Sequence, residues 1–245
     1  MELRVIFDEK HKAFWNMALD ESLLMHLKDA GPTLRLYGWN PTAVSIGYFQ
    51  SLEEEVNVER AKEMGVDLVR RITGGGAVYH KWELTYSIVL PPPPGKVLDS
   101  YKLIEKGLIE AFKDLGIEAK YSGINDIEVN GKKISGNAQT RKYGGLLQHG
   151  TILIDVDIEE MFSLLKVPRE KLKDKIIKSV KDRVTSLSAL GIDMEFQELQ
   201  KIVAEGFKKA LDADLYEEDL NREIINKAKD LEVHKYATKE WLYRR

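Results

Sequence analysis

The dipeptide Asn130-Gly131, within the segment NDIEVNGKKISGNAQ, restricts the fold of this 245-residue chain more than any other feature. Asn-Gly adopts the left-handed backbone of a two-residue turn at little cost, so the flanking residues are predicted to pair as antiparallel strands. A turn of this length also sets the register of the pairing. The expected cross-strand pairs are Val129 with Lys132, Glu128 with Lys133 and Ile127 with Ile134.

This register separates two adjacent lysines. Because successive side chains of a strand point to opposite faces, Lys133 is predicted to lie on a polar face, whereas Lys132 extends from the turn on the other face. The face of Lys133 holds Asp126, Glu128 and Ser135, and the opposite face holds Ile127, Val129 and Ile134. Two interpretations remain open: Lys133 serves a functional site, or it forms an exposed pair with Glu128 worth less than about 1 kcal/mol.

Hydrophobic patterning in the rest of the chain predicts an α+β protein with mixed, largely antiparallel sheets flanked by helices. The clearest strand is ELTYSIVL at 83–90, which the prolines at 91–94 end. Amphipathic helices are predicted at 14–28 and 101–115. Other expected elements are strands near 3–7, 33–37, 42–46, 67–72, 117–121, 126–129, 133–137 and 146–154, and a helix near 57–64.

The pattern changes after residue 158, where charged helical stretches at 196–211 and 217–231 dominate and no catalytic motif is visible. We therefore expect a catalytic domain at 1–185. Residues 186–245 are expected to form a helical C-terminal segment packed on it.

Three consecutive glycines, Gly74, Gly75 and Gly76, follow two arginines in RRITGGGAVYH. Glycine has no Cβ, so its backbone N–H groups can approach a ligand closely, and Arg70 and Arg71 carry a permanent positive charge. The segment therefore suits a phosphate or carboxylate group. The simpler alternative is a tight turn beside solvated arginines.

Together these segments resemble the lipoate-protein ligase family, within the wider group of biotin and lipoate ligases and octanoyltransferases. The matching stretches are LRLYGWNPTAVSIGYFQ, RRITGGGAVYH, NDIEVNGKKISGNAQ and LQHGTILI, so the likeness covers most of residues 1–155. It implies a catalytic domain of the biotin/lipoate ligase type, without the family's accessory domain. The sequence departs from the family at Lys81, where relatives usually carry an acid.

The resemblance also implies the positions of the site. Lys133 would be the catalytic residue. ATP and the adenylate would contact Arg71, Gly76, Ala77, Val78, Tyr79 and Lys133. Lipoate would contact Gly74, Gly75, Lys133, Ser135, Gly136, His149 and Gly150. Asn125 and Asp126 would lie near Mg²⁺.

The reaction that the resemblance implies consumes ATP. Lipoate and ATP would give lipoyl-adenylate, with Mg²⁺ as cofactor, and a lysine amine of an acceptor domain would then attack the mixed anhydride. The implied acceptors are lipoyl domains of 2-oxoacid dehydrogenase complexes or the glycine cleavage H protein. Because KYATKEWLY near Lys235 resembles the join to the family's accessory domain, a separately encoded accessory subunit is also expected.

The sequence contains no cysteine, which removes thiol nucleophiles from its own chemistry. On this ground an ATP-dependent, AMP-forming ligase is expected, and the HxxELTYS pattern shared with octanoyltransferases, at 80–87, is interpreted as kinship of fold. Two alternatives remain open: an ATP-independent octanoyl or lipoyl transferase, and a non-catalytic lipoate-binding protein. Biotin ligation is disfavoured because RRITGGGAV lacks arginines between its glycines.

Two histidines adjoin the motifs. His80 and His149 could act as general bases, although neither has the spacing of a metal ligand. His149 is expected to line the acyl or acceptor side of the pocket.

Composition excludes several other classes of protein. A net charge of -3 without a basic aromatic patch gives no case for nucleic-acid binding. No hydrophobic run reaches membrane-spanning length, and MELRVIFDEKHKAFW does not resemble a signal peptide. A cytoplasmic enzyme is expected.

Overall fold

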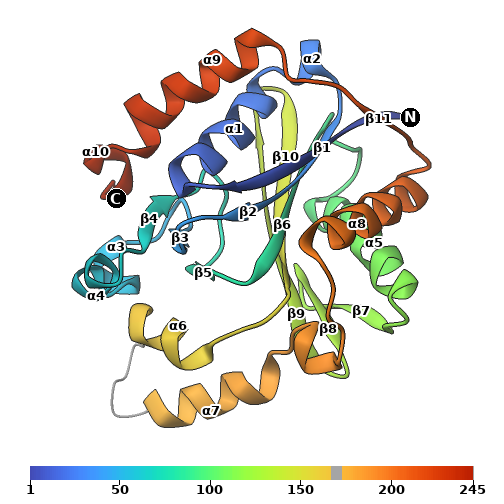
Figure 1. Ribbon diagram of the computed structural model, residues 1–245. Coiled ribbons are helices and arrows are strands. Elements are labelled where there is room, and N and C mark those ends of the chain that lie inside the picture. The colour runs from blue at the N-terminus through green and yellow to red at the C-terminus, as the bar shows by residue number, and fades with distance from the viewer. Residues whose placement is uncertain (167–172, 245) are drawn as a thin grey trace.

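The structure is a computed structural model that describes residues 1–166 and 173–244. Its described strands form one large and one small sheet (Figure 1). The large sheet has the order β11-β1-β2-β6-β10-β9-β8-β7, with β1 parallel to both of its neighbours and the other pairs antiparallel. Its strands are β1 (Glu2–His11), β2 (Thr33–Trp39), β6 (Glu83–Leu90), β7 (Ala119–Ser122), β8 (Asp126–Val129), β9 (Lys132–Lys142), β10 (Gly145–Leu153) and β11 (Asp214–Glu217). This mixed, largely antiparallel sheet confirms the expected α+β class.

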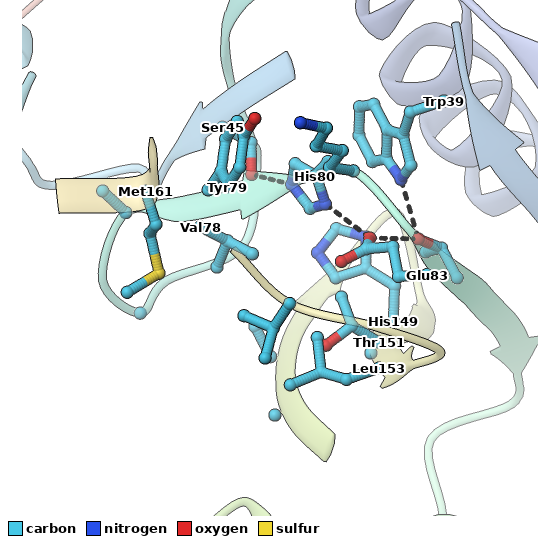
Figure 2. Close-up of a pocket in the computed structure, with 18 of the residues that line it drawn as sticks. Trp39, Ser45, Val78, Tyr79, His80, Glu83, His149, Thr151, Leu153 and Met161 are labelled. Atoms are coloured by element: carbon cyan, nitrogen blue, oxygen red, sulfur yellow. Dashed lines mark hydrogen bonds and ion pairs between the residues drawn. The ribbon is translucent and has the colours of Figure 1, made fainter. Parts of the chain in front are cut away.

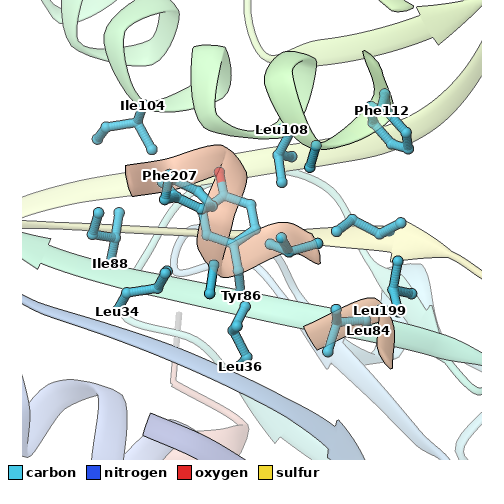
Figure 3. Packing of buried hydrophobic residues seen from close by; sticks show 14 of the residues in the cluster. Leu34, Leu36, Leu84, Tyr86, Ile88, Ile104, Leu108, Phe112, Leu199 and Phe207 are labelled. Atoms are coloured by element: carbon cyan, nitrogen blue, oxygen red, sulfur yellow. The ribbon is translucent and has the colours of Figure 1, made fainter. Parts of the chain in front are cut away.

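Helices cover both faces of the large sheet (Figure 1). On one face lie α1 (Ala13–Met25) and α9 (Arg222–Leu231), and on the other α5 (Val97–Asp114) packs against α8 (Phe196–Leu211). Figure 3 shows the core on the second face, where Tyr86 of β6 and Phe207 of α8 meet with ring centroids 5.1 Å apart. The other described helices are α2 (Leu27–Ala30), α3 (Leu52–Glu55), α4 (Val58–Glu63), α6 (Ile158–Leu164), α7 (Lys173–Arg183), α10 (Lys239–Leu242) and the turns of helix at Ser188–Leu190 and Glu232–Tyr236.

The small sheet positions the glycine triplet. It has the order β4-β3-β5, with β4 (Asp67–Arg70) parallel and β5 (Val78–His80) antiparallel to the central β3 (Ala43–Ile46). The chain must therefore reverse between β4 and β5. The glycines lie in that reversal, beside the end of β3, where the N–H of Tyr48 donates to the carbonyl of Thr73 at 2.8 Å.

The Asn130-Gly131 hairpin forms between β8 and β9, with one departure from the expected register. The pairs Val129–Lys132 and Glu128–Lys133 are confirmed, but Ile127 faces Ser135 instead of Ile134. A β-bulge makes Ile134 the extra residue, and both Ile127 and Ile134 are fully buried. The prediction that Ser135 shares the polar face was therefore wrong, because the bulge turns Ser135 into the interior.

The C-terminal part of the chain adds a strand that the sequence pattern did not indicate. β11 pairs with β1 in parallel, and α9 begins at Arg222 instead of 217, with Asn221 Oδ1 accepting from the N–H of Ile224. Phe207 and Val203 of α8 belong to the same core as the large sheet. The division into domains at residue 185 stays a prediction, and 167–172 within it lie outside the described residues.

None of the helices in the described residues combines the length and apolar character needed to cross a membrane.

Candidate active site

A cavity of about 280 Å³ lies between the small sheet and the β6–β10–β9 part of the large sheet, with α6 at one side (Figure 2). It brings the glycine loop and the β8–β9 hairpin to one place. The sequence-predicted residues that line it are Arg71, Gly75, Gly76, Ala77, Val78, Tyr79, Asn125, Lys133, Gly136, His149 and Gly150. Gly74, Asp126 and Ser135 were also predicted but do not line it. The functional roles of all these residues stay predictions.

Much of the cavity wall is apolar. Trp39, Val78, Leu153 and Met161 line it from four different elements (Figure 2). Such a wall favours a hydrocarbon chain, because burying its methylene groups removes them from water at a gain of roughly 0.8 kcal/mol each. The cavity therefore suits a medium-length acyl group.

Lys133 reaches the cavity from β9, whereas the exposed Lys132 does not line it. The Lys133 ammonium lies 2.7 Å from Oδ1 of Asp126, and its side chain is 41% exposed, so it remains accessible to a ligand. Gly136 allows this path, because a Cβ there would stand 2.6 Å from Lys133 Nζ. The carbonyl of Lys133 also accepts from the N–H of Thr185 at 2.8 Å.

Arg71 is buried and shapes the glycine loop. Its five guanidinium N–H groups donate to Thr73 Oγ1, to Ser45 O and Oγ, and to the carbonyls of Gly74 and Gly76, at 2.8–3.3 Å. All these acceptors are uncharged. Burial lowers the pKa of Arg71 to about 10, which still leaves it charged at neutral pH. Arg71 therefore supplies positive potential and loop geometry, but its donors are already used.

Arg70 has a different task from its neighbour. It donates to the carbonyls of Gly47, Tyr48, Gln50, Trp241 and Leu242, and so ties the C-terminal α10 to the loop after β3. The sequence could not separate the two arginines. Their difference arises because consecutive residues at the end of a strand point in opposite directions.

Close packing around the glycine loop predicts that alanine substitutions at two glycines differ in their effect on stability. A Cβ at Gly47 would overlap the carbonyl oxygen of Gly75, whereas a Cβ at Gly74 meets open space at ordinary backbone angles. We expect Gly47→Ala to destabilise the protein by about 1–3 kcal/mol, and Gly74→Ala to change stability much less. Thermal unfolding of the two variants measures this, and equal losses would contradict the assigned packing.

His149 belongs to a buried network that sequence reasoning missed. Its Nδ1 lies 3.3 Å from Asp20 of α1, and its Nε2 lies 2.8 Å from Thr73 Oγ1. Burial lowers the pKa of His149, only partly offset by Asp20, so the imidazole is neutral at pH 7. Burial opposes the ionisation of Asp20, but His149 and Arg35 hold its pKa below the usual value. The available signal was a charged residue on the apolar side of the α1 helix.

A second buried network joins Ser45, His80 and Glu83, all of which line the cavity (Figure 2). Ser45 Oγ lies 2.6 Å from His80 Nε2, and His80 Nδ1 lies 2.6 Å from Glu83 Oε1. Trp39 stacks on the imidazole at 3.9 Å between ring centroids. The sequence singled out His80 but neither partner, although the spacing of His80 and Glu83 was visible.

The geometry around Asp126 does not favour a magnesium site. Its Oδ1 already pairs with Lys133, and both the side-chain amide and the carbonyl of Asn125 bond to Asn137. Across 1–166 and 173–244 there is no group of three His, Cys, Asp or Glu side chains placed to hold a metal ion.

The sequence matches the family described as Lipoyl protein ligase A/B catalytic domain over residues 12–208. It is similar to Octanoyltransferase LipM of Kyrpidia tusciae, with 36% identity covering 99% of this chain and 98% of that protein. LipM of Bacillus subtilis is 34% identical, covering 94% of each chain. Among solved structures, a bi-partite lipoate protein ligase from Thermoplasma acidophilum superimposes with a TM-score of 0.93 at 32% identity, covering 100% of this chain and 98% of that one.

These relatives correct the expected reaction. An ATP-dependent, AMP-forming lipoate ligase was expected, with ATP and Mg²⁺ as cofactors, but the curated relatives that match over almost the whole chain are octanoyltransferases. A transferase moves an acyl group that is already activated, so it needs neither ATP nor an adenylate. The expectation was wrong because it rested on the missing cysteine, which restricts how an acyl group is transferred but not whether it is transferred.

The expected resemblance is confirmed by the family match, by relatives above 30% identity and by the fold. This chain belongs to the lipoyl protein ligase A/B catalytic-domain family.

Proposed function

We propose that this protein is an ATP-independent acyltransferase that moves an octanoyl or lipoyl group from a thioester on a carrier to a lysine amine of a lipoyl domain. The observation that carries the proposal is the shared cavity, in which an apolar wall and the Lys133 ammonium face the same space. The names of the curated relatives support the octanoyl group.

The apolar wall and Lys133 have complementary tasks in this reaction. The wall holds the acyl chain, which leaves the thioester carbonyl beside the polar end of the cavity. When an amine attacks, the carbonyl oxygen becomes negatively charged, and a preorganised cation at that point stabilises the transition state more than the ground state. We propose that Lys133, which lines the cavity, does this, with the buried charge of Arg71 adding to the positive potential.

The transfer is proposed to be direct. Because the sequence has no cysteine, the acyl group cannot pass through a thioester on the protein itself. A thioester already reacts with a neutral amine, so positioning and exclusion of water supply the remaining catalysis.

The partners proposed for this chain follow from one relative. The Thermoplasma acidophilum ligase was solved as a bi-partite enzyme with its E2 lipoyl domain, which supports a lipoyl domain as acceptor here. Lipoyl domains of 2-oxoacid dehydrogenase complexes and the glycine cleavage H protein are the candidates. The same relative supports a second, separately encoded subunit.

The proposal is tested by incubating the protein with a lipoyl domain and an octanoyl-carrier thioester in the absence of ATP, followed by intact-mass measurement. We expect the acceptor to gain one octanoyl group, and an acceptor whose target lysine is replaced by arginine to gain none. A parallel reaction contains free octanoate, ATP and Mg²⁺ in place of the thioester.

Modification only in the parallel reaction would contradict an ATP-independent transferase. Tight binding of lipoate or octanoate with no modified lysine under either condition would instead favour the non-catalytic binding protein.

A further inference from the structure

The hydrogen bonds around His80 form one connected chain. A carboxylate can only accept, so His80 Nδ1 donates its proton to Glu83 Oε1 at 2.6 Å. The Nε2 of a neutral imidazole then accepts the hydroxyl proton of Ser45 at 2.6 Å, and Ser45 Oγ accepts from Arg71 at 2.8 Å. Glu83 is therefore the acceptor at the end of a chain of buried hydrogen bonds that begins at a cation.

The two oxygens of Glu83 are not equivalent. Oε1 accepts from His80 and from the hydroxyl of Thr85 at 2.9 Å, and Thr85 in turn accepts from Trp39 Nε1 at 2.8 Å. The Glu83 side chain is only 1% exposed, so Oε2 is buried, and it has no hydrogen-bond partner among the described residues. A buried carboxylate oxygen without a donor is costly, and a ligand donor would relieve that cost.

The position of Glu83 points to the kind of donor. The residue lines the same cavity as Lys133, where the acyl carbonyl is placed in the proposed reaction. An acyl chain and its thioester have no N–H group, whereas the attacking lysine brings an ammonium with three. The two substrates would thus meet opposite charges: the carbonyl oxygen meets Lys133, and the amine meets Glu83.

We propose that Glu83 Oε2 binds the ε-ammonium of the acceptor lysine and takes one of its protons before attack. This inference rests on the acyl transfer proposed above. His80 and Thr85 act as positioning residues, because they hold Oε1 and so fix the orientation of the carboxylate at the cavity wall.

The step balances as follows. The ammonium gives one proton to Glu83 and becomes a neutral amine, whose nitrogen forms a bond to the thioester carbon. The C–S bond then breaks, and a second proton from the nitrogen goes to the leaving sulfur. The products are the acyl-lysine amide and the carrier thiol, and Glu83 returns its proton to water after the products leave.

The pH dependence of the amine provides the test. In water a lysine amine has a pKa near 10.4, so roughly one molecule in 2,500 is neutral at pH 7. Glu83→Gln keeps the size of the side chain and an oxygen for His80, but presents N–H donors where the ammonium would bind. We expect transfer at pH 7 to fall about 100-fold or more, and the rate of the variant to rise close to tenfold per pH unit up to pH 9. The wild-type rate should rise less steeply.

A second readout separates this role from a structural one. Hydroxylamine is already neutral at pH 7, so no proton has to be removed from it before it attacks the thioester. Glu83→Gln should therefore release the acyl group to hydroxylamine at nearly the wild-type rate. The titratable neighbours of Glu83 are His80, Tyr37 and, through Ser45, Arg71, and the substitution leaves all three in place.

Glu105→Gln is the matched control. Glu105 is also buried but does not line the cavity, and burial together with Asp126 raises its pKa to about 8, so glutamine resembles its protonated form. We expect this variant to keep the wild-type pH profile.

The role of Glu83 would be overturned if the wild type is active and the pH profile of Glu83→Gln runs parallel to that of the wild type. It would also be overturned if Glu83→Gln loses equal activity toward lysine and toward hydroxylamine. A wild type without transfer would overturn the proposed function instead.

Discussion

Lys133→Ala is expected to lower acyl transfer between about 100-fold and 1,000-fold, the usual effect of removing one preorganised oxyanion donor. Lys133 lines the cavity, and Arg71 cannot replace it because all its N–H groups are engaged. Rates of octanoyl transfer to a lipoyl domain, followed by intact mass, measure the loss.

Lys132→Ala is the control for this prediction. Lys132 precedes Lys133 but is exposed and outside the cavity, so its removal should change the rate less than about twofold, as expected for a residue without a ligand contact. Both variants should unfold near the wild-type temperature, because the Lys133–Asp126 pair is partly exposed and such pairs contribute about 0–1 kcal/mol. Equal activity of the two variants would refute the assigned role of Lys133.

Arg35→Leu is expected to lower the free energy of unfolding by about 3–5 kcal/mol, the cost of leaving a buried charge without its partner. Arg35 is fully buried on β2 and bonds to Asp8 at 2.8 Å, to Asp20 at 3.0 Å and to Asn16 at 2.7 Å. Without it, Asp20 keeps its charge in an apolar environment, supported only by neutral donors. Urea unfolding at pH 7 measures the change.

Arg60→Ala serves as the matched control. Arg60 pairs with Glu63 at 3.2 Å, but both side chains are largely exposed, so its loss should change the free energy of unfolding by less than about 1 kcal/mol. If both substitutions lower the free energy of unfolding by the same amount, the buried network around Asp20 does not stabilise the fold as its geometry indicates.

Asp20 also connects stability to the cavity. It receives hydrogen bonds from Arg35, Tyr37, Ser87 and His149, and His149 reaches Thr73 of the glycine loop. The network holds the imidazole in one orientation at the cavity wall. The network was not visible in the sequence, because its members come from α1, β2, β6 and β10.

The absence of cysteine led to a wrong prediction of the reaction. Without a cysteine, ATP-dependent activation was preferred, yet the near full-length relatives are octanoyltransferases. The Ser45–His80–Glu83 network shows that the cavity holds other polar groups suited to proton transfer. The sequence singled out His80 but not its pairing with Glu83, and it could not show that Glu83 Oε2 has no hydrogen-bond partner among the described residues.

Local signals in the sequence were sufficient for the turn at Asn130-Gly131, the strand at 83–90, the glycine loop and the α+β class, because each depends on neighbouring residues and on alternation along the chain. The bulge at Ile134, the edge strand β11, the opposite tasks of Arg70 and Arg71 and the placement of Lys133 and Glu83 on one cavity were decided by tertiary packing. Each of these depends on which distant surfaces are buried together, and a linear pattern does not contain that information.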